Sequence, residues 1–417
     1  MAAFTTLLMA VALVPLLAGG VAMILFRARR AGLNLHRQID DVRGDLQAVR
    51  AETASLIAGL RDRAEDTNLR LASIQEWIRG KDDAHPRPVL PLPPVAAGLE
   101  SRGEAELIEL AAALAILRPL VPFPCWRHDA DLYNPDLSYQ LRRWFWVHFN
   151  HRRGMAPIVV PWHAGTRLRL FLGNDISAQI YIGGCWEPNE LAFLDRILRP
   201  GMTFLDAGAN EGVYTVFAAA RVGAEGCVMS FEPSRRELER LRFNIELNRQ
   251  NVRVFPVALA DAEGRAELRI GGYQHEPHNT LGGFAYEIEA GGTEPVAVRR
   301  LDDIVREQAP ARIDLLKMDV EGAETRLLQG AGATLRQYRP IVLFEAQEAS
   351  LKQQGSTREE LVSQLRALDY TMYVFDRLTG LPCPAQPCEY DHNMIAAPLE
   401  RPLPPEAFQP FPVQAGK

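Results

Sequence analysis

Hydrophobic positions at the start of the chain form one uninterrupted apolar stretch. Between Met1 and Phe26 no residue is charged, and this length is enough to cross a bilayer core of about 30 Å. The first positive charges, Arg27, Arg29 and Arg30, follow the stretch, whereas a cleaved signal peptide carries positive charges before it. The pattern favours a retained single-pass anchor over a cleaved signal. The positive-inside bias then predicts that the rest of the chain faces the cytoplasm.

The next segment has the residue spacing of a coiled coil. Apolar residues recur in alternating steps of three and four, with a slip of phase at Ala64, at Ile39, Val42, Leu46, Val49, Leu56, Leu60, Leu71, Ile74 and Ile78. This seam predicts a coiled coil that forms a homo-oligomer, and the alternative is one amphipathic helix lying back on the rest of the chain. Prolines then crowd the sequence, which predicts a semi-rigid linker.

From about residue 100 the pattern alternates between helical and strand-like segments, which indicates α/β architecture. Glu104 to Leu117 has the pattern of a helix. The stretch from Trp126 to Trp162 is rich in aromatic and basic residues and has two interpretations: a stacking surface for nucleic acid, or a helix whose aromatic side chains pack against a sheet. Aromatic residues at this spacing favour the second interpretation.

A strand, a turn and a helix follow one another from Met202 to Arg221. The strand runs into Asp206, the turn contains Gly208, Asn210 and Gly212, and a helical pattern follows. Glycine lets the backbone approach a ligand closely at this corner of a doubly wound sheet. The turn lacks the G-x-G-x-x-G fingerprint of a dinucleotide site, and an acid leading into it suits a cationic ligand group better than a phosphate.

Two further acids follow the next two predicted strands. Glu232 comes after the strand that ends at Phe231, where a carboxylate can accept hydrogen bonds from both hydroxyls of a ribose. Asp261 follows the third strand and is placed to hold an adenine edge. Each acid also has a structural interpretation, because Glu232 can cap the next helix and Asp261 can close a turn. Acids at three consecutive strand ends favour a ligand site.

Composition narrows the classes of function. The 417 residues are 47% hydrophobic and 24% charged, which excludes a disordered chain, a collagen-like chain and a multispanning membrane protein. With 46 Lys and Arg against 52 Asp and Glu, the net charge of -6 provides no overall basic field for nucleic acid. Five cysteines, an odd number, do not suggest a disulfide framework and favour a reducing compartment.

From Arg167 to Pro398 the chain resembles the FkbM family of S-adenosylmethionine-dependent methyltransferases. Four motifs carry the resemblance: PGMTFLDAGANEGVYT at 200–215, FEP at 231–233, RLDD at 300–303 and LKMDVEGAE at 316–324. Residues 177–190 resemble the strand and turn that precede the fold in that family. The resemblance implies a Rossmann-like class I methyltransferase sheet with helices on both faces. It also implies S-adenosylmethionine as cofactor and O-methylation of a hydroxyl on a sugar, glycolipid or natural product.

The predicted donor site follows from these motifs. Its cofactor-binding residues are Asp206, Gly208, Asn210, Gly212, Tyr214, Glu232, Pro233 and Asp261.

The acceptor should approach beyond the carboxyl end of the fourth strand, which places Asp319 nearest the transferred methyl group. Asp319 has an equally weighted structural interpretation as the cap of a helix predicted over 321–329. Glu345, at the tip of the fifth strand, is a second candidate base with a core or turn alternative. His278, in the loop from Gly271 to Gly283, is a third, although histidines in polar loops are more often surface residues. No acid set has a diagnostic metal spacing, and we predict no metal.

The predicted organisation begins with an anchor and its basic flank (1–30), a coiled coil (31–80) and a proline-rich linker (81–98). The N-terminal part of the catalytic domain (99–199), the methyltransferase domain (200–400) and a proline-rich tail (401–417) follow. The predicted function is a membrane-anchored methyltransferase for a small-molecule or glycan acceptor, with no nucleic acid partner. The alternative is a coiled-coil scaffold whose methyltransferase-like domain is not catalytic. A nicotinamide-linked oxidoreductase ranks far lower because the dinucleotide fingerprint is missing.

Overall fold

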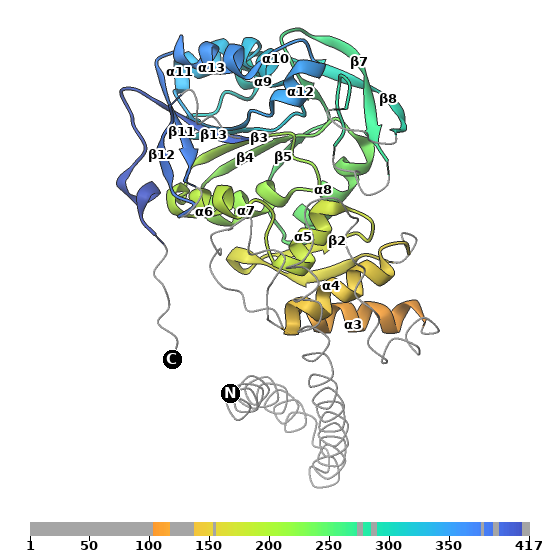
Figure 1. The fold of residues 1–417 in the computed structure, drawn as a ribbon. Coiled ribbons are helices and arrows are strands. Elements are labelled where there is room, and N and C mark those ends of the chain that lie inside the picture. The colour runs from red at the N-terminus through yellow and green to blue at the C-terminus, as the bar shows by residue number, and fades with distance from the viewer. Residues whose placement is uncertain are drawn as a thin grey trace, which may run out of the picture. The chain divides into compact units, whose positions relative to one another are not determined.

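The computed structural model describes residues 103–116, 137–152, 156–272, 278–284, 290–376, 379–386 and 392–410 (Figure 1). The predicted anchor, coiled coil and linker lie outside these residues. Within the described ranges, no helix combines the length and the apolar character needed to span a bilayer. The anchor and the coiled coil therefore stay predictions from the sequence.

An eight-stranded sheet lies at the centre, with the strand order β12-β11-β13-β10-β9-β3-β4-β5. Its strands are β3 (Thr203–Ala207), β4 (Cys227–Phe231), β5 (Arg253–Phe255), β9 (Leu315–Met318), β10 (Ile341–Glu345), β11 (Tyr370–Phe375), β12 (Pro382–Pro384) and β13 (Asn393–Pro398). Strands β10, β9, β3, β4 and β5 are parallel, and β13 runs antiparallel to β10 and to β11. The order reverses between β3 and β9, so a topological switch point lies at their carboxyl ends.

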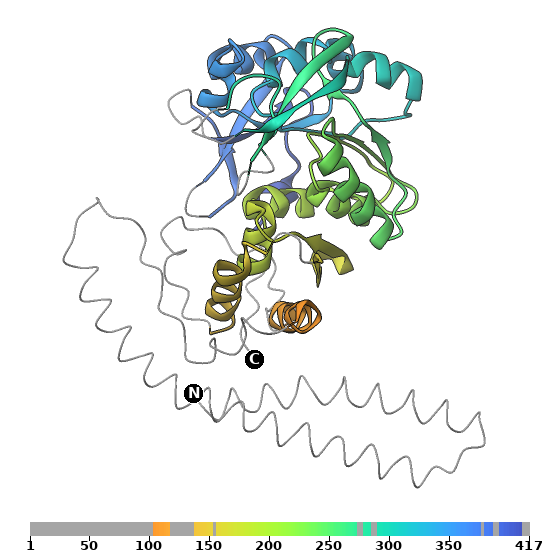
Figure 2. The same cartoon turned by 90° about the vertical axis from the view of Figure 1, so that its right-hand side faces the viewer.

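Helices cover both faces of this sheet (Figures 1 and 2). On one face lie α6 (Pro188–Ile197) and α7 (Val213–Val222), and on the other lie α9 (Leu301–Gln308), α10 (Glu324–Gln329), α11 (Gly332–Tyr338) and α13 (Arg358–Arg366). Phe204 and Leu205 are neighbours on β3 and both are fully buried, yet they pack into opposite clusters. Strand pleating explains this, because successive side chains point to opposite faces. The predicted α/β fold, a largely parallel sheet with helices on both faces, is confirmed.

Two further helices and a smaller, three-stranded sheet accompany the central sheet. Helix α8 (Arg235–Leu247) follows β4, and α12 (Glu348–Gln353) follows β10. Strands β6 (Ala258–Leu259), β8 (Ala290–Arg299) and β7 (Gly264–Gly271) form a three-stranded sheet in that order. Leu268, Val296 and Val298 make its own small core.

The N-terminal part of the described chain packs through aromatic side chains. It consists of α3 (Glu104–Ile116), α4 (Leu137–Phe149), β1 (Ile158–Pro161), a 3-10 turn (His163–Gly165), β2 (Arg167–Leu170) and α5 (Asp175–Gly183). A second 3-10 turn (Pro405–Phe408) lies near the other end of the chain. Phe145 and Trp146 of α4 are buried and contact the ring of Tyr181 on α5. Interior packing is thus confirmed for these two aromatic side chains, but their partner is a helix where a sheet was expected, and residues 126–136 and 153–155 of the predicted segment lie outside the described residues.

Two predictions of local structure are wrong. Residues 177–190 form α5 and the start of α6 where a strand and turn were expected. Asn174 explains this, because its side chain accepts a hydrogen bond from the amide of Ser177 and caps α5, which ends at Gly184 (φ +99°). Asp319 does not cap the following helix, because α10 begins only at Glu324.

Candidate functional site

The glycine turn, residues 208–212, joins β3 to α7 at the carboxyl end of the sheet. Gly208 (φ +76°) and Asn210 (φ +51°) lie in the left-handed region, so the chain reverses sharply before the helix begins at Val213. A Cβ atom on Gly208 would collide with the carbonyl oxygen of Asp319. Only glycine fits there, which brings the backbone of this turn directly against the loop that follows β9.

That loop, residues 319–322, is here called the acidic turn, and it joins β9 to α10. The amide of Asp319 donates to the carbonyl of Ala207 over 3.1 Å. Glu321 (φ +53°) and Gly322 (φ +97°) turn the chain, and the carboxylate of Glu324 accepts from the amide of Val320 over 2.9 Å. The glycine turn and the acidic turn therefore meet at the switch point, where open α/β sheets bind their ligands.

Glu232 lies at the tip of β4, beside the glycine turn. Its Oε2 accepts from the amide of Asn210 and its Oε1 from the amide of Ser234, each over 2.8 Å. Burial and the charge of Glu237 raise the pKa of Glu232 to about 8, although the two amide hydrogen bonds oppose the rise. Each carboxylate oxygen keeps lone-pair capacity beyond these amides, so Glu232 is placed to accept further donors.

Asp206, at the end of β3, is fully buried. Thr215 donates to its Oδ2 over 2.6 Å, and Lys317 Nζ lies 3.6 Å from Oδ1. Burial raises the pKa of Asp206, and the charge of Lys317 opposes the rise. Asp206 thus has protein partners on both sides, and its predicted contact with a cationic ligand group stays a prediction.

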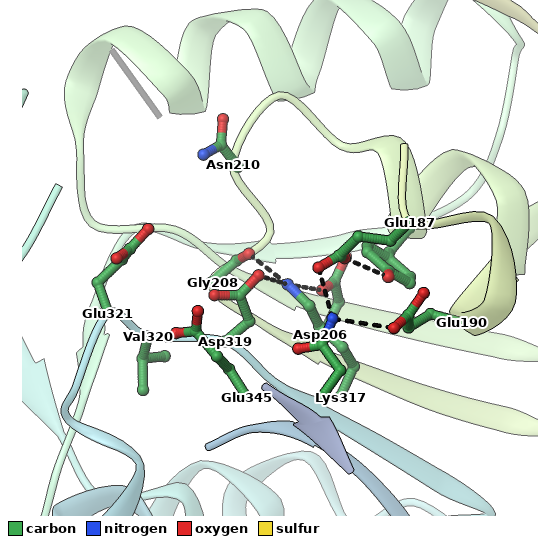
Figure 3. Close-up of polar contacts among 12 residues, drawn as sticks. Glu187, Glu190, Asp206, Gly208, Asn210, Lys317, Asp319, Val320, Glu321 and Glu345 are labelled. Atoms are coloured by element: carbon green, nitrogen blue, oxygen red, sulfur yellow. Dashed lines mark hydrogen bonds and ion pairs between the residues drawn. The ribbon is translucent and has the colours of Figure 1, made fainter. Parts of the chain in front are cut away.

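Lys317, on β9, ties the two turns together. Its Nζ donates to the carbonyl of Gly208 over 2.9 Å, lies 3.2 Å from Asp319 Oδ2, and stands 4.9 Å from the ring centre of Tyr214 (Figure 3). Burial disfavours its charge, but the neighbouring carboxylates outweigh that effect and raise the pKa of Lys317. A buried cation thus fixes the relative position of the glycine turn and the acidic turn.

Two of the three predicted acceptor-side groups lie at the same sheet edge. The side chain of Asp319 is 31% exposed. The buried carboxyl of Glu345, at the tip of β10, contacts His392 Nε2 over 2.8 Å, and its Oε2 has no hydrogen-bond partner among the described residues. Burial, and then the charge of Asp319, raise the pKa of Glu345 well above its usual range. The structure therefore brings Asp319 and Glu345 together.

His278 lies between two carboxylates. Its Nδ1 is 2.9 Å from Glu321 Oε1 and its Nε2 is 3.2 Å from Asp175 Oδ2. Burial disfavours its charge, but the hydrogen bonds to Asp175 and Glu321 dominate and raise the pKa of His278 to about 11. Each nitrogen must carry a proton to satisfy its carboxylate, so in this arrangement neither is left to take a proton from an acceptor.

The remaining predicted cofactor residues have varied surroundings. Gly212 (φ +91°) packs against Leu241, and Pro233 directly follows Glu232. The hydroxyl of buried Tyr214 donates to Glu187. Asp261 pairs with Arg326 of α10 over 2.8 Å, which lowers the pKa of Asp261. The structure thus pairs Asp261 with a side chain of α10. The predicted contact of Asp261 with adenine stays a prediction.

Three residues of this region were not identified as site residues from the sequence. Glu187 and Asn393 are joined by a 2.7 Å hydrogen bond beside Lys317 and Asp319 (Figure 3). The buried carboxylate of Glu211 in the glycine turn accepts from Asn174 at the start of α5 over 2.6 Å. Their positions depend on contacts between segments far apart in sequence, for which one sequence gives no signal.

Within the described residues, no group of three or more His, Cys, Asp and Glu has an arrangement that would hold a metal ion.

Comparisons with known proteins agree with this arrangement. Residues 206–372 match the family model of the methyltransferase FkbM domain. The chain is 32% identical over 157 residues to the 2-O-methyltransferase NoeI of Sinorhizobium fredii, covering 34% of this chain and 63% of that protein. It is 31% identical over 160 residues to the 31-O-demethyl-FK506 methyltransferase FkbM of Streptomyces tacrolimicus, covering 32% of this chain and 60% of that protein. It is 30% identical over 208 residues to the AMB antimetabolite synthetase AmbE of Pseudomonas aeruginosa, covering 40% of this chain and 9% of that protein.

The matches thus span less than two thirds of each of these three relatives. The family match includes the glycine turn, Glu232 and the acidic turn, which are the segments that the structure brings together. Residues 206–372 are therefore similar to the methyltransferase FkbM domain, and this similarity indicates S-adenosylmethionine as the cofactor, as the sequence predicted.

Proposed function

We propose that this chain is an O-methyltransferase, which transfers the methyl group of S-adenosylmethionine to a hydroxyl on a sugar, glycolipid or natural product. One observation carries the proposal: the glycine turn and Glu232 adjoin the acidic turn with Asp319 at the switch point of the sheet. The names of two relatives, a 2-O-methyltransferase and a 31-O-demethyl-FK506 methyltransferase, support oxygen as the methylated atom.

The residues present fit the donor. Glu232 offers acceptor lone pairs to the ribose hydroxyls at the tip of β4, beside the glycine turn. S-adenosylmethionine supplies a methyl group activated by a positively charged sulfur, and a site rich in carboxylates favours that charge. These carboxylates disfavour an acceptor that carries negative charge next to its hydroxyl, so a neutral polyol fits better.

The protein's share of the chemistry is alignment and proton removal. Lys317 and the direct backbone contact hold the two turns in one position, and such fixed geometry lowers the barrier of an in-line displacement. A carboxylate at the acceptor edge takes the hydroxyl proton, a step that contributes typically about 10²–10⁴-fold to the rate. His278 does not serve this step in the observed arrangement, because both its nitrogens face carboxylates.

A labelling experiment tests the reaction. The full-length protein is incubated with methyl-tritiated S-adenosylmethionine and with separated glycolipid, polysaccharide and small-molecule fractions of the cells that produce it. We expect label in a product that resists mild base, because methyl ethers survive base and methyl esters do not. Base-labile label would contradict hydroxyl methylation. If the protein binds the donor and labels no fraction, the non-catalytic scaffold becomes the better account.

We also propose that residues 1–26 anchor the protein in a membrane with the methyltransferase domain in the cytoplasm. The proposal rests on the absence of charge in this stretch and on Arg27, Arg29 and Arg30 after it. Replacing Leu13 and Leu17 by arginine should release the protein from sedimented membranes, since each charge at a helix centre costs about 2.5–3.5 kcal/mol. Replacing both by alanine should not, and equal sedimentation of all variants would argue against the anchor.

A further inference from the structure

Glu187 has an unusual backbone for its position. It lies at the N-terminal boundary of α6 with φ +44° and ψ +67°, a left-handed conformation that residues with a Cβ atom rarely adopt. Its side chain makes no capping hydrogen bond to that helix. The conformation instead directs the carboxylate toward Lys317 and the acidic turn (Figure 3).

Two neutral donors hold this carboxylate in place. The hydroxyl of Tyr214 donates to Oε2 over 2.5 Å, and the side-chain amide of Asn393 donates to Oε1 over 2.7 Å. Tyr214 comes from α7 and Asn393 from the start of β13, so two separate elements fix the orientation. Glu187 is only partly buried, and each of its oxygens has lone-pair capacity left.

Charged groups face Glu187 from several elements. Asp319 and Lys317 face it from the acidic turn and β9, and Glu345 from the tip of β10. Glu190, one turn along α6, shares the amide of Asn393 with it. Glu345 adds an independent sign of a missing ligand, because its buried Oε2 has no hydrogen-bond partner among the described residues.

Asp319 and Glu187 differ in what already engages them. Lys317 Nζ lies 3.2 Å from Oδ2 of Asp319, so an ion pair already engages one oxygen of this carboxylate. The hydrogen-bond donors of Glu187 are a neutral hydroxyl and a neutral amide. Glu187 is a rigid, partly exposed carboxylate without a direct ion pair to Lys317, so it is the better placed of the two to receive a proton.

We propose that Glu187 is the catalytic base, which takes the proton of the acceptor hydroxyl while Asp319 orients that hydroxyl. This inference rests on the proposed O-methyl transfer. The acceptor O–H bond breaks and its proton passes to the Glu187 carboxylate. The acceptor oxygen gains the methyl group, the donor's methyl–sulfur bond leaves its electron pair on sulfur as a neutral thioether, and Glu187 later returns the proton to solvent.

The position of the acid limb of the pH profile distinguishes the two acids. Burial and the charge of Asp319 raise the pKa of Glu187, while the hydrogen bonds from Tyr214 and Asn393 and the charge of Lys317 lower it. A base must be ionised, so turnover should rise with pH through this pKa. Tyr214→Phe keeps the ring beside Lys317 and removes one hydrogen bond to the ionised form. The acid limb should therefore move to higher pH, and Asn393→Leu should move it in the same direction.

The test uses the full-length protein in the tritium-transfer assay. Glu187→Gln should lower kcat by about 10²–10⁴-fold, the usual effect of losing a general base. The Kd of S-adenosylmethionine by calorimetry should stay within about twofold, that is within about 0.4 kcal/mol. Glu225→Gln, a control at an exposed acid in the loop before β4, should keep kcat within about twofold of the wild type. Glutamate carboxyl ¹³C resonances provide a second readout, because the signal missing in Glu187→Gln should titrate at higher pH in Tyr214→Phe.

Three results would overturn the proposal. One is a Glu187→Gln variant with nearly full kcat, and another is an acid limb that Tyr214→Phe leaves in place. The third is a wild type that binds the donor and transfers no label, which removes the proposed function as well. Transfer by the wild type with an unaffected Glu187→Gln variant removes only the role of Glu187, and leaves Asp319 as the base.

Discussion

The carbonyl oxygen of Asp319 occupies the space that a Cβ atom on Gly208 would need. The glycine turn and the acidic turn therefore touch through backbone atoms, with no side chain between them. Lys317 stabilises the same contact by donating a hydrogen bond to the carbonyl of Gly208. Because methyl transfer requires donor and acceptor atoms in line at about 3–3.5 Å, this contact sets the geometry on which the proposed reaction depends.

Gly208→Ala should damage both stability and donor binding. The new Cβ has to displace the acidic turn, and φ +76° adds a left-handed cost of about 1–2 kcal/mol. Gly201→Ala is the matched control, because Gly201 has φ +83° with open space around it and should show the stability loss alone. Thermal unfolding and calorimetry with S-adenosylmethionine measure the two effects. If Gly208→Ala bound S-adenosylmethionine with wild-type affinity, the contact between the glycine turn and the acidic turn would not determine donor binding.

Donor binding should tighten as pH rises toward 8. Burial and the charge of Glu237 raise the pKa of Glu232 to about 8, and the ionised form is the better acceptor for ribose hydroxyls. At pH values below that pKa, the Kd of S-adenosylmethionine should fall by up to about tenfold for each unit by which the pH rises. The Kd of Glu232→Gln should not depend on pH in this way. Calorimetry between pH 6 and pH 9 checks this. Equal slopes in both proteins would assign the titration to another group.

The stability of the fold should respond to Glu232 in the opposite sense. Its folded pKa of about 8 exceeds the usual 4.5, so the carboxyl costs stability increasingly as pH rises between these values. Glu232→Gln removes that cost. We expect its melting temperature to exceed that of the wild type at pH 8 and to match it near pH 4.5. A gain that is the same at both pH values would contradict the shifted pKa.

His278 should stabilise the fold most at low pH. Its pKa of about 11 in the folded state lies above the ordinary 6.5, so its contribution is complete below pH 6.5 and is lost as pH rises toward 11. His278→Asn should therefore be destabilising at pH 6 and much less so at pH 10, as measured by urea unfolding. His151→Asn, on an exposed residue, serves as control for the substitution itself. A pH-independent loss in His278→Asn would mean that packing, and not charge, fixes the loop.

Parts of the site could be predicted from the sequence because they are local. A strand, a glycine turn and a helix follow one another over residues 203–222, and an acid directly after β4 must end beside them in a parallel sheet. The positions of Glu232 and Asp319 follow from this rule alone. The α/β fold followed in the same way, from the alternation of strand and helix patterns.

The rest depends on contacts between distant segments. The surroundings of His278 come from Asp175, 103 residues away, so the sequence suggested a free loop histidine where the structure has an ion-paired one. The sequence did not show that buried Lys317, 111 residues further along the chain, would lie 3.6 Å from Asp206. Glu187 stayed unrecognised because its left-handed backbone is set by tertiary packing and not by residue type.

Calorimetry of S-adenosylmethionine and S-adenosylhomocysteine with the full-length protein tests the central claim most directly. Glu232→Ala is measured beside Glu225→Ala, which changes an exposed acid in the loop before the same strand. We predict micromolar binding of both ligands to the wild type and to Glu225→Ala, and a loss of at least about tenfold in Glu232→Ala, equal to about 1.4 kcal/mol. Binding that Glu232→Ala leaves unchanged would contradict the donor site at the ends of β3 and β4, and a folded protein that binds neither ligand would favour the scaffold.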